Sequence, residues 1–275
     1  MTVRQIFSHF LEGAPWVEPG NTADGIEIGP LDREVTRVGV GWSACLPNLR
    51  AAAEGKCDLF ITHEPCFCEF WEPELRFRET EWGRLRSGLC RENGMALMAL
   101  HDTWDGWPVY GIRDSWAALL GLRPEDLLER RSYGNKENDW LGLYQVPETT
   151  VDGFALHVAE KVRQFGGRGV AMMGDGDGLV HKVAVGTGCG IPTFEMLELG
   201  ADVLVQVFDR AYQTFTRLPL LDLGANAIVL EHGLTEMPGM RNMARYLTET
   251  FPTTDALFFC NEPLTRFVEA LQDRE

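Results

Sequence analysis

The sequence lacks any hydrophobic run long enough to cross a membrane. No stretch of about 18 or more consecutive apolar residues occurs, which argues against a transmembrane helix. The N-terminal residues Met1–Phe10 also lack the continuous apolar core of a secretion signal. We therefore expect a cytoplasmic protein with no membrane partner.

Paired-cysteine motifs are absent as well. The chain has seven cysteines, an odd number, and none of them forms a C-x-x-C pair, so neither a disulfide framework nor a zinc ribbon is indicated. Cys66 and Cys68 are the closest pair, and a C-x-C could bind a soft metal. Packing is the favoured role, because alternate positions of an extended segment face the same side.

Basic residues are scarce relative to acidic ones. The sequence has 25 Lys and Arg against 41 Asp and Glu, a formal charge of −16. Such a protein repels phosphate backbones, so nucleic acid is not an expected partner. The acidic surplus favours metal cations, and we expect a small-molecule substrate.

Short apolar runs alternate with segments of helical periodicity along the 275 residues, which predicts an α/β fold with parallel strands. The Gly- and Pro-rich segment 13–30 is predicted to be a loop. The expected strands cover 37–42, 58–62, 95–100, 140–146, 170–173, 182–185, 202–206, 227–230 and 256–259. The expected helices cover 3–11, 46–54, 80–93, 114–120, 152–165, 193–199, 211–218 and 237–250.

Three polar clusters follow apolar runs: His63-Glu64, His101 with Asp105, and His232 with Glu236. The carboxyl ends of parallel strands converge on a ligand-binding crevice, so the three clusters are expected at one edge. Residues four apart share a helix face, and an imidazole with a carboxylate suits zinc, iron or manganese. A single cluster would more often be a hydrogen-bonded histidine or a helix cap.

The segment 123–139 is rich in charge and contains Pro124 and Gly134-Asn135, so it is predicted to be a boundary. We expect a first α/β domain at 1–124 and a second at 138–275, with the metal site in the cleft between them.

Two further features each allow two interpretations. Trp104, Trp107 and Tyr110 could stack on a substrate or pack at a domain interface. The glycine-rich segment 186–190 could hold an anion, although such glycines more often permit a tight strand-to-helix turn.

Three motifs together resemble the NIF-three-like dinuclear metal-centre family, also called GTP cyclohydrolase 1 type 2-like. They are Ile61–Phe67, His101–Asp105 followed by Gly111–Leu122, and Glu231–Glu236. The resemblance implies two divalent ions and a homo-oligomer shaped as a ring. It implies metal ligands at His63, His101, Asp105, His232 and Glu236.

Glu64 departs from the family pattern, because it occupies the position of the second histidine in the family's His-His pair. Glu64 could be a ligand that shifts the preference toward harder metals, a general base, or neither. Glu231 also departs, since the family usually has Gly before the third His.

The function expected from this site is metal-dependent hydrolysis of a nucleotide or other small phosphoester. Asp105 and Glu236 are the candidates for bridging two metals, and Glu64 or Glu231 could accept a proton from the attacking water. The alternative is a non-catalytic, metal-binding regulatory or scaffold protein, whose site would be closed to solvent.

Overall fold

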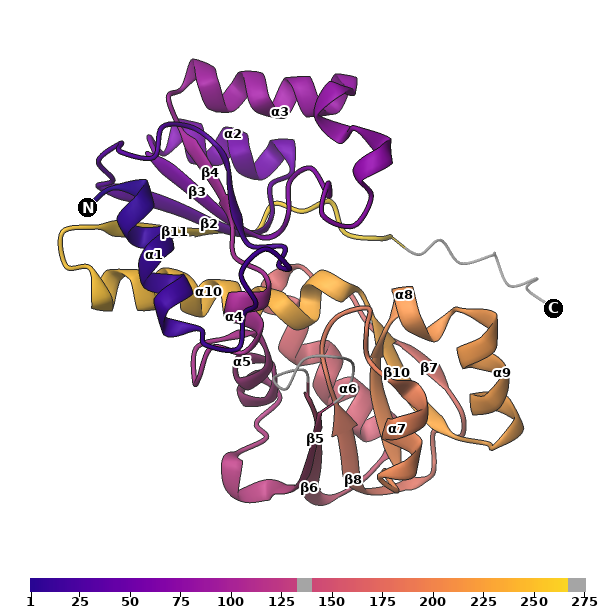
Figure 1. Ribbon diagram of the computed structural model, residues 1–275. Helices are drawn as coiled ribbons and strands as arrows, with labels where there is room; N and C mark the ends of the chain where they lie inside the picture. The colour runs from indigo at the N-terminus through magenta and orange to yellow at the C-terminus, as the bar shows by residue number, and fades with distance from the viewer. Residues whose placement is uncertain (133–139, 267–275) are drawn as a thin grey trace.

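The computed structural model describes residues 1–132 and 140–266 (Figure 1). Its strands are β1 (Gly25–Ile28), β2 (Arg37–Ser43), β3 (Leu59–Glu64), β4 (Ala96–Ala99), β5 (Leu127–Ser132), β6 (Trp140–Thr150), β7 (Ala171–Met173), β8 (Leu179–Val185), β9 (Val203–Val207), β10 (Asn226–Leu230) and β11 (Asp255–Phe259). Its α-helices are α1 (Val3–Gly13), α2 (Leu46–Glu54), α3 (Glu81–Glu92), α4 (Asp102–Asp105), α5 (Ile112–Leu119), α6 (Val151–Val162), α7 (Thr193–Glu198), α8 (Phe208–Ala211), α9 (Thr214–Asp222) and α10 (His232–Thr250). The short 3₁₀ helices are η1 (Pro73–Leu75), η2 (Phe77–Glu79), η3 (Pro124–Asp126) and η4 (Arg163–Phe165). The α/β class expected from the sequence is confirmed.

The first sheet has the strand order β1-β4-β3-β2-β11. Strands β4, β3, β2 and β11 run parallel, and β1 pairs antiparallel with β4 at the edge. Helices α2 and α3 lie on one face, and α1 and α10 lie on the other (Figure 1). Alternate residues of β3 supply the two cores: Leu59 and Ile61 pack toward α1 and α10, and Phe60 packs toward α2.

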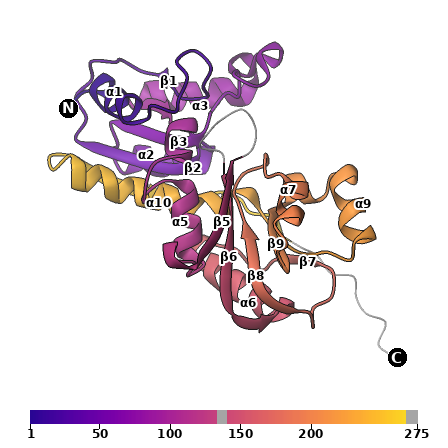
Figure 2. The same cartoon turned by 60° about the horizontal axis from the view of Figure 1, so that its bottom comes forward.

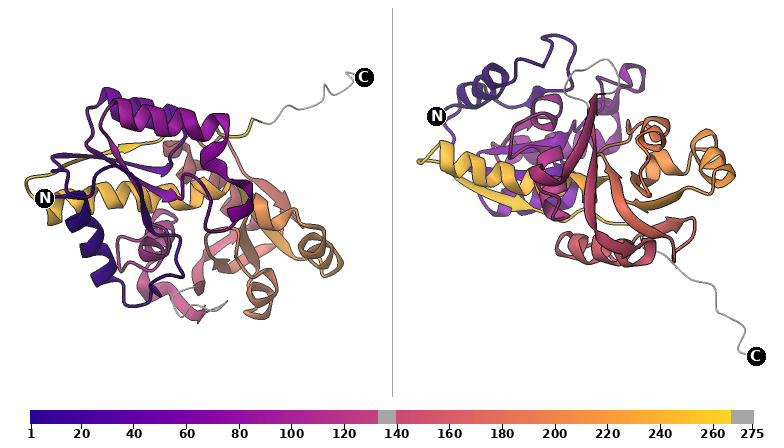
Figure 3. Two further views of the ribbon diagram at one scale, coloured as in Figure 1. Left: turned by 45° about the horizontal axis from the view of Figure 1, so that its top comes forward. Right: turned by 90° about the horizontal axis from the view of Figure 1, so that it is seen from below.

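The second sheet has the strand order β5-β6-β8-β9-β10-β7. Its centre, β8, β9 and β10, is parallel, and antiparallel strands flank that centre on both sides. Helix α6 covers one face, and α7 and α9 cover the other (Figure 3, right). The parallel centre is buried on both faces, which explains its continuous apolar sequence.

Helix α10 joins the two sheets (Figure 2). Its first half contributes Leu234 and Met237 to the core of the second sheet, and its second half contributes Met240 and Met243 to the core of the first. A Cβ at Gly239 would lie 2.7 Å from Ile112 Cδ1, so glycine permits α10 to approach α5 closely. The start of α10 is thereby held at the junction of the two sheets.

Three features of the fold differ from the sequence predictions. Strand β1 lies within the segment predicted to be a loop, and β5 lies within the segment predicted to be a boundary. Strand β11 pairs with β2 in the first sheet, although the expected range 138–275 groups it with the second. The apolar pattern of a strand does not encode its partner, and α10 carries the chain back to the first sheet. The expected domain limits themselves stay a prediction.

The membrane prediction can be examined for the helices within 1–132 and 140–266. None of them is both long and apolar enough to span a bilayer. The cytoplasmic location expected from the sequence stays a prediction.

Candidate metal centre

The three predicted clusters lie together. His63 and Glu64 end β3, and His101 follows β4, which is the parallel neighbour of β3 in the first sheet. The third cluster lies in α10, which follows β10 of the second sheet. Within each of four groups the possible ligand atoms lie within 4.8 Å of one another. The groups are His63, Glu64 and His101; His63, Asp105 and Glu236; Glu64, His232 and Glu236; and His101, Asp102 and Asp105.

Glu236 lies between the two halves of this cluster. Its Oε2 is 3.4 Å from Nε2 of His63, and its Oε1 is 3.0 Å from Nε2 of His232. Asp105 directs both oxygens to one half instead: Oδ1 lies 3.7 Å from His63 Nε2 and Oδ2 lies 3.6 Å from His101 Nδ1. Of the two carboxylates predicted to bridge, Glu236 has the geometry that spans both halves.

His63 has the clearest geometry of a metal ligand. Its Nδ1 is 3.3 Å from the carbonyl oxygen of Leu100, so Nδ1 is the nitrogen suited to hold the proton. Its Nε2 is buried without a hydrogen-bond partner, and the nearest oxygens of Glu236 and Asp105 lie 3.4 and 3.7 Å away. A buried lone pair facing two carboxylates is repelled by them unless a cation lies between. His63 therefore fits a metal ion.

Two aspartates hold the second predicted histidine. Asp102 Oδ1 lies 3.2 Å from His101 Nδ1, while its Oδ2 accepts hydrogen bonds from the Thr22 hydroxyl and the Ala23 amide. Asp24 accepts the backbone N–H of His101. Carboxylates that orient ligand histidines are common around metal sites. The backbone and the ring of His101 are thus both fixed.

His232 is held between two carboxylates. Its Nδ1 is 2.9 Å from Oδ2 of Asp209, which leaves Nε2 to face Glu236 at 3.0 Å and Glu64 at 3.8 Å. The indole N–H of Trp42 donates to Glu236 Oε2, the oxygen that faces His63, at 2.7 Å and leaves Oε1 to face His232. The nitrogen that faces the cluster is therefore set by Asp209.

The carboxylates change the protonation of these groups. Burial opposes the charged imidazole of His101, yet Asp105 and Asp102 raise its pKa to about 10. Burial likewise opposes the charge on His232, and Glu236 and Asp209 raise its pKa well above the usual value. Burial would raise the pKa of Glu236, but His232 and His63 lower it to about 2. Without a metal, protons on the two histidines therefore balance the carboxylates.

One side of the cluster is accessible. The side chains of His63 and Glu236 are 0% and 3% exposed, whereas Glu64 is 24% exposed. The glycine-rich turn after β8 lies against the second half: a Cβ at Gly188 would be 3.3 Å from Glu236 Oε1. Gly188 has φ of 76°, so a side chain there would also strain the backbone. His63 and Glu236 therefore form the buried part of the centre, and the side that carries Glu64 is partly open to solvent.

Several residues considered from the sequence lie outside the cluster. Glu231 precedes α10, and its carboxylate accepts the backbone N–H of Thr265. Trp104 and Trp107 are buried and stack on each other, and Tyr110 contacts Tyr246, so packing is the interpretation that the structure supports.

The cysteine pair considered from the sequence also serves packing. Cys66 is buried in the core between the first sheet and α2, and burial raises the pKa of its thiol to about 12. A thiol that stays protonated at neutral pH is a poor metal ligand. Neither Cys66 nor Cys68 belongs to the four groups of possible ligand atoms.

Sequence reasoning missed Asp102, Asp209, Trp42 and Asp24. The first two follow β4 and β9, as the predicted ligands follow their own strands, and Trp42 lies near the end of β2. Examination of every residue at or just after the end of a predicted strand could have found Asp102, Asp209 and Trp42. Asp24 lies just before a short strand in the predicted loop, where no pattern marks it.

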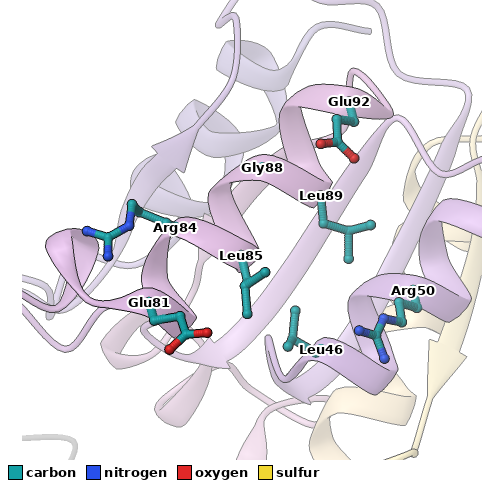
Figure 4. A pocket seen from close by; sticks show the side chains of 8 residues that line it. All are labelled: Leu46, Arg50, Glu81, Arg84, Leu85, Gly88, Leu89 and Glu92. Carbon is teal, nitrogen blue, oxygen red and sulfur yellow. The ribbon is translucent and has the colours of Figure 1, made fainter.

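A separate hollow lies between α2 and α3 (Figure 4). Its volume is about 380 Å³, and its side chains combine leucines with two arginines and two glutamates. None of its lining residues belongs to the histidine and carboxylate cluster.

The donor set of the cluster suits divalent cations. Three imidazoles and four carboxylates contribute nitrogen and oxygen atoms, a mixture that zinc, iron and manganese accept. The unpartnered Nε2 of His63 and the fixed orientation of the other two histidines agree with that use. The residues present therefore fit the metals that the sequence motifs imply.

Several solved structures share the fold of this chain. The solved structure of protein SA1388 from Staphylococcus aureus superposes with a TM-score of 0.77 at 17% identity, covering 97% of this chain and 99% of that one. A Bacillus cereus protein related to NIF3 gives 0.77 at 17% identity, with 98% and 99% covered. Reduced HcgD from Methanocaldococcus jannaschii gives 0.69 at 18% identity, with 95% and 98% covered. These likenesses show a shared fold.

Curated relatives and a family model extend the match to the sequence. A GTP cyclohydrolase 1 type 2 homolog from Clostridium perfringens is 22% identical over 227 residues, which are 82% of each chain. A protein of the same name from Halobacterium salinarum is 27% identical over 184 residues, 66% of this chain and 69% of that one. The model of the family described as Duf34/NIF3 (NGG1p interacting factor 3) matches residues 1–263. The chain therefore belongs to the Duf34/NIF3 family.

Proposed function

We propose that this protein binds two divalent metal ions and hydrolyses a small phosphoester, with a nucleotide as the favoured substrate. The observation that carries the proposal is Glu236, whose two oxygens face His63 and His232 in separate halves of the cluster. One half comprises His63, His101 and Asp105, and the other is centred on His232. Glu64 lies in one group with His63 and His101 and in another with His232 and Glu236. Both halves share Glu236.

Two ions held there would polarise a phosphoryl oxygen and lower the pKa of a water molecule. The chain's own residues would fix the geometry. His63 and Glu236 form the buried base, while Asp102 and Asp209 hold His101 and His232 in place. Glu64 is the most exposed of the three ligand carboxylates, at 24% against 19% for Asp105 and 3% for Glu236. Glu64 is therefore both a ligand and the candidate to accept a proton from the attacking water.

The partial exposure of the cluster favours catalysis over a purely structural role. Structural metal sites are usually closed by protein ligands, whereas catalytic sites keep a position open to water or substrate. The names of the curated relatives, GTP cyclohydrolase 1 type 2 homologs, also agree with hydrolysis on a nucleotide.

A screen of the manganese-loaded protein against nucleotides and simple phosphate esters tests the hydrolase assignment. Metal-dependent release of phosphate or of an altered base is the expected result. A protein that binds metal but turns over no substrate in the screen would favour the scaffold role.

Metal affinity is expected to rise with pH between about 6 and 8, because binding must displace protons from His101 and His232. The pKa of His101 is about 10 without metal, so the imidazole is protonated across this range. Each displaced proton raises the apparent affinity about tenfold per pH unit. Competition with a chelator at several pH values, using Zn²⁺, measures the slope.

The matched control is His157→Gln, since His157 Nε2 contacts the carbonyl oxygen of Leu120 away from the cluster. This variant should keep the slope, whereas a metal affinity of the wild-type protein that does not change with pH would contradict the displacement of protons from the histidines.

The raised pKa of His101 also affects the stability of the metal-free fold. Because the pKa is raised in the folded state, His101 adds to the free energy of unfolding. This contribution is fully present below pH 6.5 and is lost as the pH rises through about 10.

We also propose that the chain forms a homo-oligomer through α9. This helix exposes a row of apolar side chains: Phe215, Leu218 and Leu221 are 58%, 52% and 54% exposed. Exposed apolar patches of this kind mark association surfaces. Glutamate at both Leu218 and Leu221 is expected to dissociate the oligomer, as measured by analytical ultracentrifugation. Glutamate at the exposed Leu156 of α6 is the control, and a monomeric wild-type protein would refute the proposal.

A further inference from the structure

The segment after β3 carries an exposed tryptophan beside the metal-ligand cluster. The ring centroids of Trp71 and His101 are 5.3 Å apart, and their planes are inclined by 72°. The side chain of Trp71 is 44% exposed, as is that of Phe70. Among the tryptophans whose side chains the structure describes, only Trp71 is exposed.

Contacts on both sides of Trp71 fix its position. The backbone N–H groups of Trp71 and Glu72 both donate to the carbonyl oxygen of Cys68, which forms a tight turn. The adjacent Glu69 accepts from Arg78 Nε at 2.7 Å. Arg78 also donates to the carbonyl oxygen of Glu27 at 2.9 Å and covers the ring of Phe67 at 4.1 Å. These contacts fix the backbone of the segment that carries Trp71 beside the cluster.

An exposed indole does little for the folded state, because much of its apolar surface stays in water. The buried Trp104 and Trp116 show where tryptophan stabilises this fold. The near-perpendicular arrangement with His101 keeps the two rings from stacking on each other. The ring of Phe70 also meets that of Trp71 in a T-shaped contact, at 6.0 Å between centroids, and Trp71 stays partly exposed beside a proposed metal ligand.

We propose that Trp71 binds the base of a nucleoside phosphate whose phosphate group is held at the metal centre. This inference rests on the proposed hydrolase function and names its substrate class. Two divalent ions at the centre would coordinate phosphate oxygens directly, so the centre can hold an anion although carboxylates surround it. Every base has a planar aromatic face, so stacking on Trp71 selects for the presence of a base without distinguishing one base from another.

The test compares AMP with ribose 5-phosphate, which carries the same phosphoester without the base. Calorimetric binding to the manganese-loaded protein and the kinetics of phosphate release are both measured. Wild type is expected to bind AMP roughly tenfold more tightly than ribose 5-phosphate. Trp71→Ala should abolish this preference without changing the affinity for ribose 5-phosphate, and Trp71→Phe should retain part of it.

Leu75→Ala is the matched control, because Leu75 lies in the same segment, is 55% exposed and has no ring. Circular dichroism checks that each variant is folded. Hydrolysis of both compounds with the same preference in wild type and Trp71→Ala would overturn this inference and leave the hydrolase function standing. AMP binding that depends on Trp71, with no hydrolysis of either compound, would support the role of Trp71 and overturn the hydrolase function. Binding of neither compound would overturn both.

Discussion

Replacing Glu236 by glutamine is expected to lower the affinity for both metal ions and to reduce phosphoester hydrolysis by at least about 100-fold. The side chain faces His63 through one oxygen and His232 through the other, so a single change affects both halves of the centre. Glutamine keeps the shape and can still accept the hydrogen bond from the Trp42 indole. The lost negative charge is therefore the main difference between the two proteins.

Glu249→Gln provides the control on the same helix. Glu249 is exposed and accepts a hydrogen bond from the Tyr110 hydroxyl at 2.8 Å, far from any proposed ligand. Metal content is measured by elemental analysis after dialysis, and hydrolysis by phosphate release. A Glu236→Gln protein that retains both metal content and activity would remove Glu236 from the centre.

Replacing Glu64 by alanine is expected to lower the metal content from about two ions per chain to about one. Among the described residues, the only group that contains His232 loses one of its three possible ligands, whereas His63, Asp105 and Glu236 still form a group without Glu64. Glu64→His, which restores the pair of histidines typical of the family, should recover the second ion and shift preference toward zinc, because imidazole is softer than carboxylate. Elemental analysis of protein purified without metal-affinity resin measures both effects.

Glu231→Ala is the control for the Glu64 variants. Glu231 precedes His232 directly, but its carboxylate binds the Thr265 backbone instead of the cluster. This variant should keep the full metal content. If Glu64→Ala also keeps two ions, Glu64 is not a ligand and only its role as a proton acceptor remains.

The ends of the parallel strands explain why so much of the candidate site could be predicted. Apolar runs identify β3, β4 and β10, and the polar residues that follow β3 and β4 lie together because these two strands are parallel neighbours in one sheet. The third cluster follows β10 of the second sheet, and it meets the first two because α10 begins at the junction of the two sheets. The i, i+4 spacing then puts His232 and Glu236 on one face of α10, where they are 3.0 Å apart. These are local signals, and the sequence contains them.

Pairing and tertiary contacts account for what could not be predicted. Strand β11 is separated from its partner β2 by the whole second sheet, and no local pattern records that pairing. Strand β5 is charged and exposed at the sheet edge, so it lacks an apolar signal. Asp24 and Trp71 reach the cluster from irregular segments, and only the folded backbone shows that they contact His101.

Anomalous diffraction from crystals soaked in Mn²⁺ tests the central claim most directly, because it locates each ion. The account predicts two peaks: one bounded by His63, His101, Asp105 and Glu236, and one bounded by Glu64, His232 and Glu236. No peak at these residues, or a single peak that does not contact Glu236, would contradict a shared dinuclear centre.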